Sequence, residues 1–430
     1  MNIKYIPFRQ IHPALKQEIL VEFERFYDDQ DYILGRGLAR FEAQYANFNQ
    51  VEHAIGVGNG HDALLIILKC LGIGKGDEVL VPAHTFIATV LPIIHVGATP
   101  VLVDIDENTM NIQVNSIEKF VNPKTSAIVP VHLYGNPCEM DELMTLAKSR
   151  HLHIIEDNAQ AQGATFKAHK TASMGIMNFT SYYPTKNIGA FGDAGLITTN
   201  DAMLAAKARA CRNYGRSGDS GYTLAGVNSR MDELQARLLY IKLKYLEQWN
   251  AERKAIAELY ESHLLGVEEL QMQTSNRDCC NVRHIFPIIT KNRDALRLHL
   301  KSSGIETLIH YETPLHLHHA LKFLKYKKGD FPHAEKVCKS ELSLPIYPGL
   351  KEAEVRYICE QIKNFCELSL KKKRVAIPVT LQSLPDATQA FEGFQSGIDR
   401  YRGSSYGLLA NVFSWPLSPT APTDFLSNTF

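Results

Sequence analysis

The stretch DEVLVPAHTFIATVLPIIHVGATPVLVDID (77–106) contains two short apolar runs with a longer apolar segment between them. The runs at 77–83 and 99–106 predict strands, and the segment 85–97 has helical spacing and ends at Gly97. Helices that separate strands in this way connect parallel strands through right-handed crossovers. We therefore expect residues 77–106 to form one strand–helix–strand unit of a parallel sheet.

The same alternation extends to both sides of this unit. Helices are predicted at 61–72, 116–122 and 140–151, and further apolar runs that predict strands lie at 53–59, 126–135 and 152–158. The nearly continuous apolar character of AIVPV and LHII is typical of strands that are covered on both faces. The sequence therefore predicts an α/β fold with a mostly parallel central sheet and helices on both faces.

The pattern changes after about residue 230. One long amphipathic helix is predicted over 231–264, and it leads to the apolar segment 283–290, a helix near 292–303 and the segment 353–370. We expect a large domain over 1–240, a small C-terminal α+β domain over 241–372, and a tail of uncertain order over 373–430. The tail is rich in Ser, Pro, Gly and Thr and lacks sustained periodicity.

Charge and composition exclude several classes of function. The 430 residues include 46 basic and 46 acidic side chains, so no nucleic-acid surface is expected. No apolar run of about 18 residues predicts a membrane-spanning helix, and the first residues lack a signal-peptide core. The eight cysteines form no CxxC pair, which argues against a metal site and favours reduced thiols in the cytoplasm.

Two segments with unusual residues follow predicted strands, where ligands bind in open parallel sheets. In VGNGHDALL (57–65) a glycine turn precedes a helix that starts near His61, and the free N–H groups of such a start favour phosphate. An ordinary strand-to-helix turn is the alternative. In IIEDNAQAQGA (154–164) Asp157 either caps a helix or pairs with a protonated ring nitrogen, and Gln160 could hydrogen-bond the same ligand.

A third segment, SYYPTKNIGAFGDAG (181–195), places Lys186 among aromatic and small residues. Such crowding removes hydration, lowers the pKa of the amine and makes it nucleophilic. The alternative is a lysine that reaches solvent or pairs with Asp193. Taken together, a phosphate-binding helix start, an acid for a pyridinium nitrogen and a Schiff-base lysine are what a protein must supply to hold pyridoxal phosphate.

Ordered motifs over residues 5–370 resemble the nucleotide-sugar aminotransferases of the DegT/DnrJ/EryC1/StrS family. They include GVGNGHDAL, VHLYG, EDNAQAQGA, SYYPTKNIGAFGDAG, NSRMDELQA and LSLPIYP. The resemblance implies the aspartate-aminotransferase type I fold and transfer of an amino group from an amino acid, expected to be glutamate, to a nucleotide-linked keto sugar. Several motifs most resemble enzymes that aminate C3 of a dTDP-linked 3-keto-6-deoxyhexose. Surface polysaccharide or lipopolysaccharide synthesis is the context that the family implies.

The resemblance also implies roles for individual residues. Lys186 matches the Schiff-base lysine, and Asp157 matches the carboxylate that pairs with the pyridine nitrogen. Asn228 matches a phosphate ligand from the neighbouring subunit, which implies a homodimer with shared active sites. The other residues that match cofactor ligands are Gly60, His61, Phe86, Gln160 and Ser181, and the candidates for the substrate side are Tyr183, His310 and His316.

Several other functions remain as alternatives. A close rival is amination of a 4-keto sugar, and a rival of a different class is a non-catalytic binding or regulatory protein with the same fold. Sugar C3 deoxygenation uses a histidine in place of the lysine in this family, so Lys186 argues against it. A nicotinamide-binding protein is disfavoured because the chain lacks the GxGxxG fingerprint after its first predicted strand.

Overall fold

The computed structural model describes residues 1–7 and 15–375 of the chain. Residues 1–371 form one compact unit, and the predicted division at residue 240 stays a prediction. Most of the predicted tail lies outside the described residues, and its first three positions belong to a helix that ends at Val375. No helix in the described part of the chain is long and apolar enough to cross a membrane.

The central sheet begins with four parallel strands. They follow the order β3 (Thr99–Val103), β2 (Glu78–Pro82), β4 (Thr125–Ile128) and β5 (His153–Ile154). Residues 78–82 pair with 99–103 in parallel, so the predicted parallel pairing of these two strands is confirmed. The carboxyl ends of these strands consequently lie at one edge of the sheet.

A second set of strands, absent from the predictions except for β1, continues the sheet. It consists of β8 (Asn178–Ser181), β9 (Gly195–Thr199) and β1 (His53–Val57), with β9 antiparallel to both neighbours. Parallel bridges from Val131 to Asp157 and from Asp157 to Phe179 join it to the first set. The whole sheet is therefore mostly parallel, with β9 running in the opposite direction.

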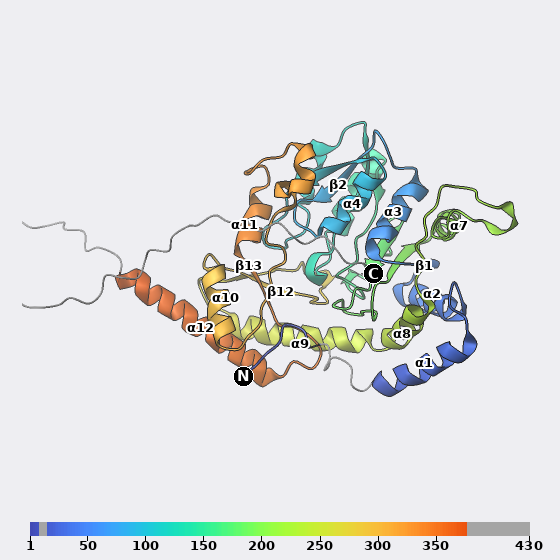
Figure 1. Cartoon of the computed structure of the whole chain (residues 1–430). Helices are drawn as coiled ribbons and strands as arrows, with labels where there is room; N and C mark the ends of the chain where they lie inside the picture. The colour runs from blue at the N-terminus through green and yellow to red at the C-terminus, as the bar shows by residue number, and fades with distance from the viewer. Residues whose placement is uncertain (8–14, 376–430) are drawn as a thin grey trace, which may run out of the picture. The chain divides into compact units, whose positions relative to one another are not determined.

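Helices cover both faces of the sheet, as predicted (Figure 1). Because side chains of a strand alternate between faces, Ile55 packs with one group of helices and Ala54 with the other. The first group is α3 (Gly60–Leu71), α4 (Leu91–His95) and α7 (Ala202–Cys211). The second group is α2 (Arg36–Asn49), α6 (Met140–Arg150) and α8 (Glu233–Leu243).

The remaining elements form a C-terminal part and several short segments. The C-terminal part packs α9 (Leu246–Leu264), α10 (Arg293–Ser302) and α12 (Glu352–Val375) around a small antiparallel sheet. That sheet contains β10 (Gln271–Met272), β12 (Phe286–Ile289) and β13 (Glu341–Leu344). The other elements are α1 (Lys16–Asp29), α5 (Val114–Ile117), α11 (Pro332–Ser340), β6 (Thr165–Phe166), β7 (His169–Lys170) and β11 (Cys279–Cys280).

Three predicted helices differ from those observed. The helix predicted over 116–122 is instead the four-residue α5 (Val114–Ile117) followed by a 3-10 turn at Glu118–Phe120. In place of a helix over 85–97, a short 3-10 turn at Ile87–Thr89 precedes α4, because Pro92 lacks an N–H group and is tolerated only in the first turn. The long helix predicted over 231–264 divides into α8 and α9. No proline or glycine marks that break, but Lys242 and Tyr245 beside it bond to distant groups, the Gly189 carbonyl and the Glu18 carboxylate.

Candidate active site

A cavity of about 560 Å³ lies at the carboxyl edge of the central sheet. It is lined by the first turn of α3, the segment after β2, the end of β8 and two segments of the C-terminal part of the chain. Nine of the eleven residues predicted for the site line it. They are Gly60, His61, Phe86, Asp157, Gln160, Ser181, Tyr183, Lys186 and His310.

Lys186 lies in the loop between β8 and β9. The backbone N–H of Lys186 donates to the carbonyl of Tyr183 at 2.9 Å, and a side chain at Gly189 would come within 2.4 Å of the Pro184 carbonyl oxygen. The loop is thus folded tightly enough to require glycine. The amine of Lys186 makes no hydrogen bond to any described residue, and burial lowers its pKa to about 8, although the charge of Asp157 opposes the shift.

Asp157 is held rigidly within the sheet. Its N–H donates to the Pro130 carbonyl and its carbonyl accepts the His132 N–H on one side, and a parallel bridge joins Asp157 to Phe179 on the other. Its carboxylate accepts hydrogen bonds from the Thr89 hydroxyl at 2.9 Å and the Ala159 N–H at 3.0 Å. Burial raises the pKa of Asp157, while these two bonds and the charge of Lys186 favour the ionised form.

The first turn of α3 and the end of β8 form a cradle for an anion. Asn59 caps α3 by accepting the Asp62 N–H at 2.8 Å, and Gly60 and His61 in the first turn line the cavity. The first N–H groups of a helix have no partner within the helix. A side chain at Gly60 would come within 2.9 Å of the Ser181 Cβ atom. The Ser181 hydroxyl therefore lies beside a helix start, which is a favourable place for a phosphate.

Aromatic and amide side chains form the wall of the cavity. Phe86 is 56% exposed, and the centre of its ring lies 5.7 Å from that of Tyr311. The Gln160 amide donates to the Tyr311 hydroxyl at 3.0 Å, and its oxygen accepts the Tyr134 N–H at 2.6 Å. The open face of Phe86 offers a surface on which a planar ligand can stack.

The remaining two predicted residues do not line this cavity. His316 is buried, where its Nε2 atom lies 3.0 Å from the Glu335 carboxylate and its ring packs against Phe331. Asn228 is exposed and pairs with Asn213 in an isolated bridge. Neither residue therefore faces Lys186 within its own chain.

Two residues that touch this machinery were missed from the sequence. Tyr311, which bonds to Gln160, directly follows His310 and could have been found as part of the same motif. Thr89 bonds to Asp157 from a turn between β2 and α4. A threonine in an apolar segment carries no sequence signal for such a contact, because the contact depends on how the chain folds.

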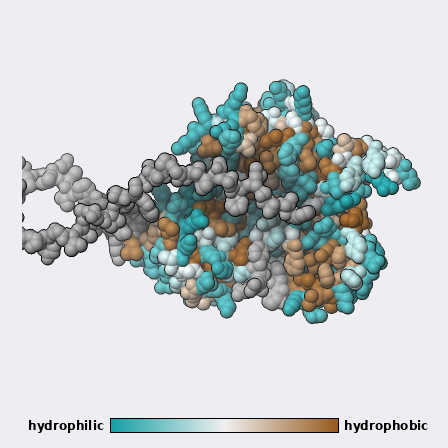
Figure 2. Space-filling model, in the orientation of Figure 1, coloured by the Kyte–Doolittle hydropathy of each residue, from teal (hydrophilic) through white to brown (hydrophobic). Residues whose placement is uncertain are grey.

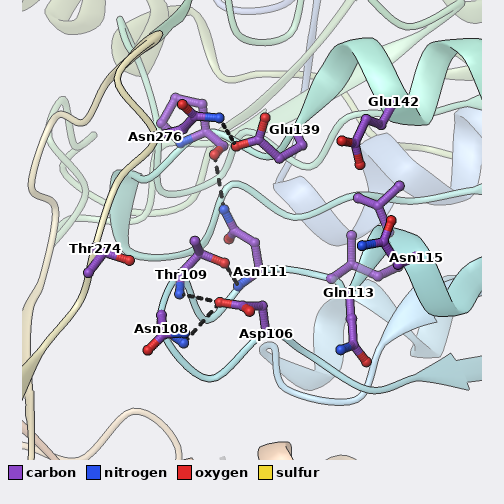
Figure 3. A pocket seen from close by; sticks show the side chains of 13 residues that line it. Asp106, Asn108, Thr109, Asn111, Gln113, Asn115, Glu139, Glu142, Thr274 and Asn276 are labelled. Atoms are coloured by element: carbon purple, nitrogen blue, oxygen red, sulfur yellow. Dashed lines mark hydrogen bonds between the residues drawn. The ribbon is translucent and has the colours of Figure 1, made fainter.

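A second cavity, of about 410 Å³, lies near the 106–115 segment (Figure 3). Its lining is rich in amides and carboxylates that bond to neighbours within it. Asp106 accepts the N–H groups of Asn108 and Thr109, and Asn276 donates to Glu139 at 2.6 Å. None of the residues predicted for the site lines this cavity.

Comparisons with known proteins support the assignment of the first cavity as the candidate active site. Residues 13–363 match the DegT/DnrJ/EryC1/StrS aminotransferase family. The dTDP-3-amino-3,4,6-trideoxy-alpha-D-glucose transaminase of Streptomyces venezuelae is 39% identical over 85% of this chain and 97% of that protein. The dTDP-3-amino-3,6-dideoxy-alpha-D-galactopyranose transaminase of Aneurinibacillus thermoaerophilus is 40% identical over 84% of this chain and 99% of that protein.

Solved structures show the same fold. S. venezuelae DesV has a TM-score of 0.83 at 39% identity, covering 85% of this chain and 99% of that chain. NtdA from Bacillus subtilis, solved with bound cofactor PMP, has a TM-score of 0.78 at 28% identity, covering 84% of this chain and 85% of that chain. The fold is therefore that of the pyridoxal phosphate-dependent aminotransferases, the aspartate-aminotransferase type I fold.

The residues of the cavity fit pyridoxal phosphate. Lys186, whose amine has no hydrogen-bond partner among the described residues, the buried Asp157 carboxylate and an anion cradle at a helix start line one cavity. These groups suit an aldehyde, a protonated ring nitrogen and a phosphate, respectively. The match to the family covers most of the chain. The chain belongs to the DegT/DnrJ/EryC1/StrS aminotransferase family and is an aminotransferase that uses pyridoxal phosphate.

Proposed function

We propose that the chain transfers an amino group from L-glutamate to C3 of a dTDP-linked 3-keto-6-deoxyhexose. The observation that carries this proposal is the placement of Lys186 and Asp157 in one cavity beside an anion cradle. The position on the sugar is supported by the names of relatives. Four of them, at 33–40% identity, are named as transaminases of 3-amino, 3-dehydro or 3-oxo nucleotide sugars.

The cavity offers a partner for each part of the cofactor. Lys186 would hold the aldehyde carbon, Asp157 would face the ring nitrogen, and the ring would lie against Phe86 with Gln160 near its oxygen. The phosphate would rest on the first turn of α3 beside Ser181. When bound, pyridoxal phosphate carries the amino group between the two substrates and accepts electrons from the carbon that loses a proton.

Lys186 would also move protons. A pKa near 8 leaves a fraction of the amine neutral at physiological pH, so its nitrogen can take the proton from the α-carbon of the amino donor. The same nitrogen can then pass this proton to the cofactor. Asp157, held by Thr89 and Ala159, would keep its negative charge directed at a protonated ring nitrogen. Tyr183 and His310 line the cavity and are proposed to contact the sugar.

Incubation with glutamate and a panel of dTDP-linked keto sugars tests the reaction. We expect 2-oxoglutarate and a sugar product that carries nitrogen at C3, identified by mass spectrometry and NMR. Nitrogen at C4 would instead support the 4-keto alternative. A protein that retains cofactor and converts neither type of sugar would contradict the proposed substrate class, and an incubation without glutamate serves as the control.

We further propose a cytoplasmic homodimer with shared active sites that serves surface polysaccharide or lipopolysaccharide synthesis. Asn228 is exposed and lies outside its own cavity, as a residue that serves a neighbouring subunit would. Apolar side chains of α1 are also exposed, and Figure 2 shows apolar residues gathered over this helix. Contiguous exposed apolar surface is typical of a protein interface. The cysteines are free, as in a reducing compartment.

Mixing two impaired variants tests whether each active site contains residues of both subunits. Lys186→Ala and Asn228→Ala dimers should each be impaired, but a mixed dimer contains one site in which both residues are intact. After subunit exchange at equal amounts, we expect roughly one quarter of the activity of the wild-type protein, since half of the dimers are mixed. Two affinity tags confirm exchange. Mixed dimers without recovered activity would show that Asn228 serves its own subunit or no site.

A further inference from the structure

A buried hydrogen-bonded chain connects the cavity to β13. Glu341 and Ser343 are two residues apart on this strand and share a face. The Ser343 hydroxyl bonds to Oε1 of Glu341, and Nδ1 of His310 lies 2.9 Å from the same hydroxyl. The backbone N–H of His310 donates to Oε2 of Glu341 at 2.7 Å. Glu341 and Ser343 are both fully buried.

The strand pairing holds this chain in register. The Ser343 N–H donates to the Leu308 carbonyl at 2.8 Å, which fixes the 308–310 segment against β13. His310 lines the cavity, and its Nε2 atom bonds to no described residue. Of the two ring nitrogens, Nδ1 is therefore committed to the buried chain and Nε2 is left for a ligand.

The number of protons in this hydrogen-bonded chain decides which ring nitrogen of His310 carries a proton. The Ser343 hydroxyl has a single proton, and Oε2 of Glu341 is occupied by a backbone N–H. If Glu341 is ionised, Ser343 must donate to Oε1 and accept from Nδ1–H, which leaves Nε2 as an acceptor. If Oε1 is protonated, it donates to Ser343, which donates to Nδ1, and His310 then carries its proton on Nε2.

We propose that Glu341 and Ser343 are positioning residues that set the tautomer of His310, so that Nε2–H donates to an oxygen of the keto sugar when Glu341 is protonated. Nε2 becomes an acceptor when Glu341 ionises. The proposal rests on the proposed function in one respect, that His310 contacts the sugar. The coupling between Glu341 and the tautomer stands on the buried geometry alone.

The surroundings of Glu341 place this change near neutral pH. Burial raises the pKa of Glu341 to about 8, opposed by the bonds from Ser343 and His310 and by the charge of Arg293. Tyr5 interacts with Ser343 and stays neutral through this range because burial raises its pKa. The other ionisable groups that face Glu341 are likewise neutral through this range, since burial lowers the pKa of His310 to about 4 and raises those of Tyr134, Tyr311 and Cys338.

Glu341→Gln mimics the protonated state of Glu341 and cannot ionise. The glutamine oxygen can still accept the His310 N–H, while its amide donates to Ser343 as the protonated acid does. This variant should hold the proton on Nε2 at every pH. Ser343→Ala removes the middle of the chain and should uncouple the tautomer from pH. Glu306→Gln, an exposed carboxylate of the same segment that pairs with Lys4, is the matched control.

The direct readout is nitrogen NMR of the holoenzyme labelled with 15N-histidine, with His310 assigned from the signal lost in His310→Gln. We expect the proton to move from Nε2 to Nδ1 between pH 6.5 and 9.5 in the wild type, and to stay on Nε2 in Glu341→Gln. One fixed tautomer in the wild type, or a Glu341→Gln variant that still switches, would overturn the proposal. This measurement needs no sugar, so it is informative even if the proposed reaction fails.

Kinetics test the link to the sugar. In the wild type, kcat/KM for the keto sugar should fall about tenfold as Glu341 ionises, the usual cost of one lost hydrogen bond. Glu341→Gln should lose this step, while the reaction with glutamate alone keeps its pH dependence. Lys186, whose pKa is lowered to about 8, titrates in the same range, but its contribution appears in both reactions. Equal changes in both reactions would contradict the positioning role.

Discussion

Lys186→Ala is expected to reduce turnover by at least about 10⁴-fold, because it removes the amine that we propose as both the nucleophile and the proton carrier of the site. The same change should abolish the visible absorbance that a Schiff base with the cofactor gives to the purified protein. No other lysine lines the cavity, so no described lysine can take over the role. Absorbance scans and turnover with glutamate and keto sugar measure the two effects.

Two further lysine variants make this result specific. Lys186→Arg keeps a positive charge but cannot form the carbon–nitrogen double bond, so it should be as inactive as the alanine variant. Lys254→Ala changes an exposed lysine on α9 and should leave activity and absorbance unchanged. If Lys186→Ala retained both signals, the assignment of the site would be wrong.

Asp157→Asn is expected to retain the cofactor and to lower turnover by about 10²- to 10³-fold, the usual effect of removing one preorganised charge interaction. The amide is neutral, so it cannot stabilise a protonated ring nitrogen as the carboxylate does. It can still accept the Ala159 N–H, which keeps the local fold intact. Cofactor content by absorbance and turnover by coupled assay separate binding from catalysis.

The stability of the cofactor-free protein provides a second readout for this variant. The folded-state pKa of Asp157 is raised, so the stability that Asp157 contributes is fully present below its unfolded pKa and is lost as pH rises through the folded value. At neutral pH the neutral amide should therefore be no less stable than the buried carboxylate. Asp201→Asn, at the start of α7, is the control, because asparagine caps helices as well as aspartate. Unchanged turnover in Asp157→Asn would refute the proposed role of Asp157 as the partner of the ring nitrogen.

The layered fold was predictable because local patterns encode it. Buried parallel strands are continuously apolar, so β2, β3 and β4 could be read directly from 77–106 and 126–135. By contrast, β8 and β9 were missed: they flank a glycine-rich loop, and their pairing depends on partners far away in the chain. The break between α8 and α9 was also missed, since tertiary contacts and not a helix-breaking residue accompany it.

The residues that line the candidate site were predictable where an unusual residue follows a strand. Lys186 and Asp157 stood out because charged groups are rare in apolar or crowded surroundings. The hydrogen bonds from Glu341 through Ser343 to His310 could not be found in this way, because β13 and the 308–310 segment meet only in the folded protein. His316 shows the converse: a histidine in a polar row that the fold pairs with Glu335 away from the cavity.

The reversed direction of β9 allows the lysine loop to stay at the ligand-binding edge. A loop between two adjacent antiparallel strands begins and ends at the same edge of the sheet, whereas a parallel successor would require a crossover that carries the chain to the opposite end. Gly195 pairs with both Ser181 and Val57 at this edge. The spacing between Lys186 and the start of α3 is consequently set by strand register, and a slip of β9 by one residue would separate the groups that we propose to bind one cofactor.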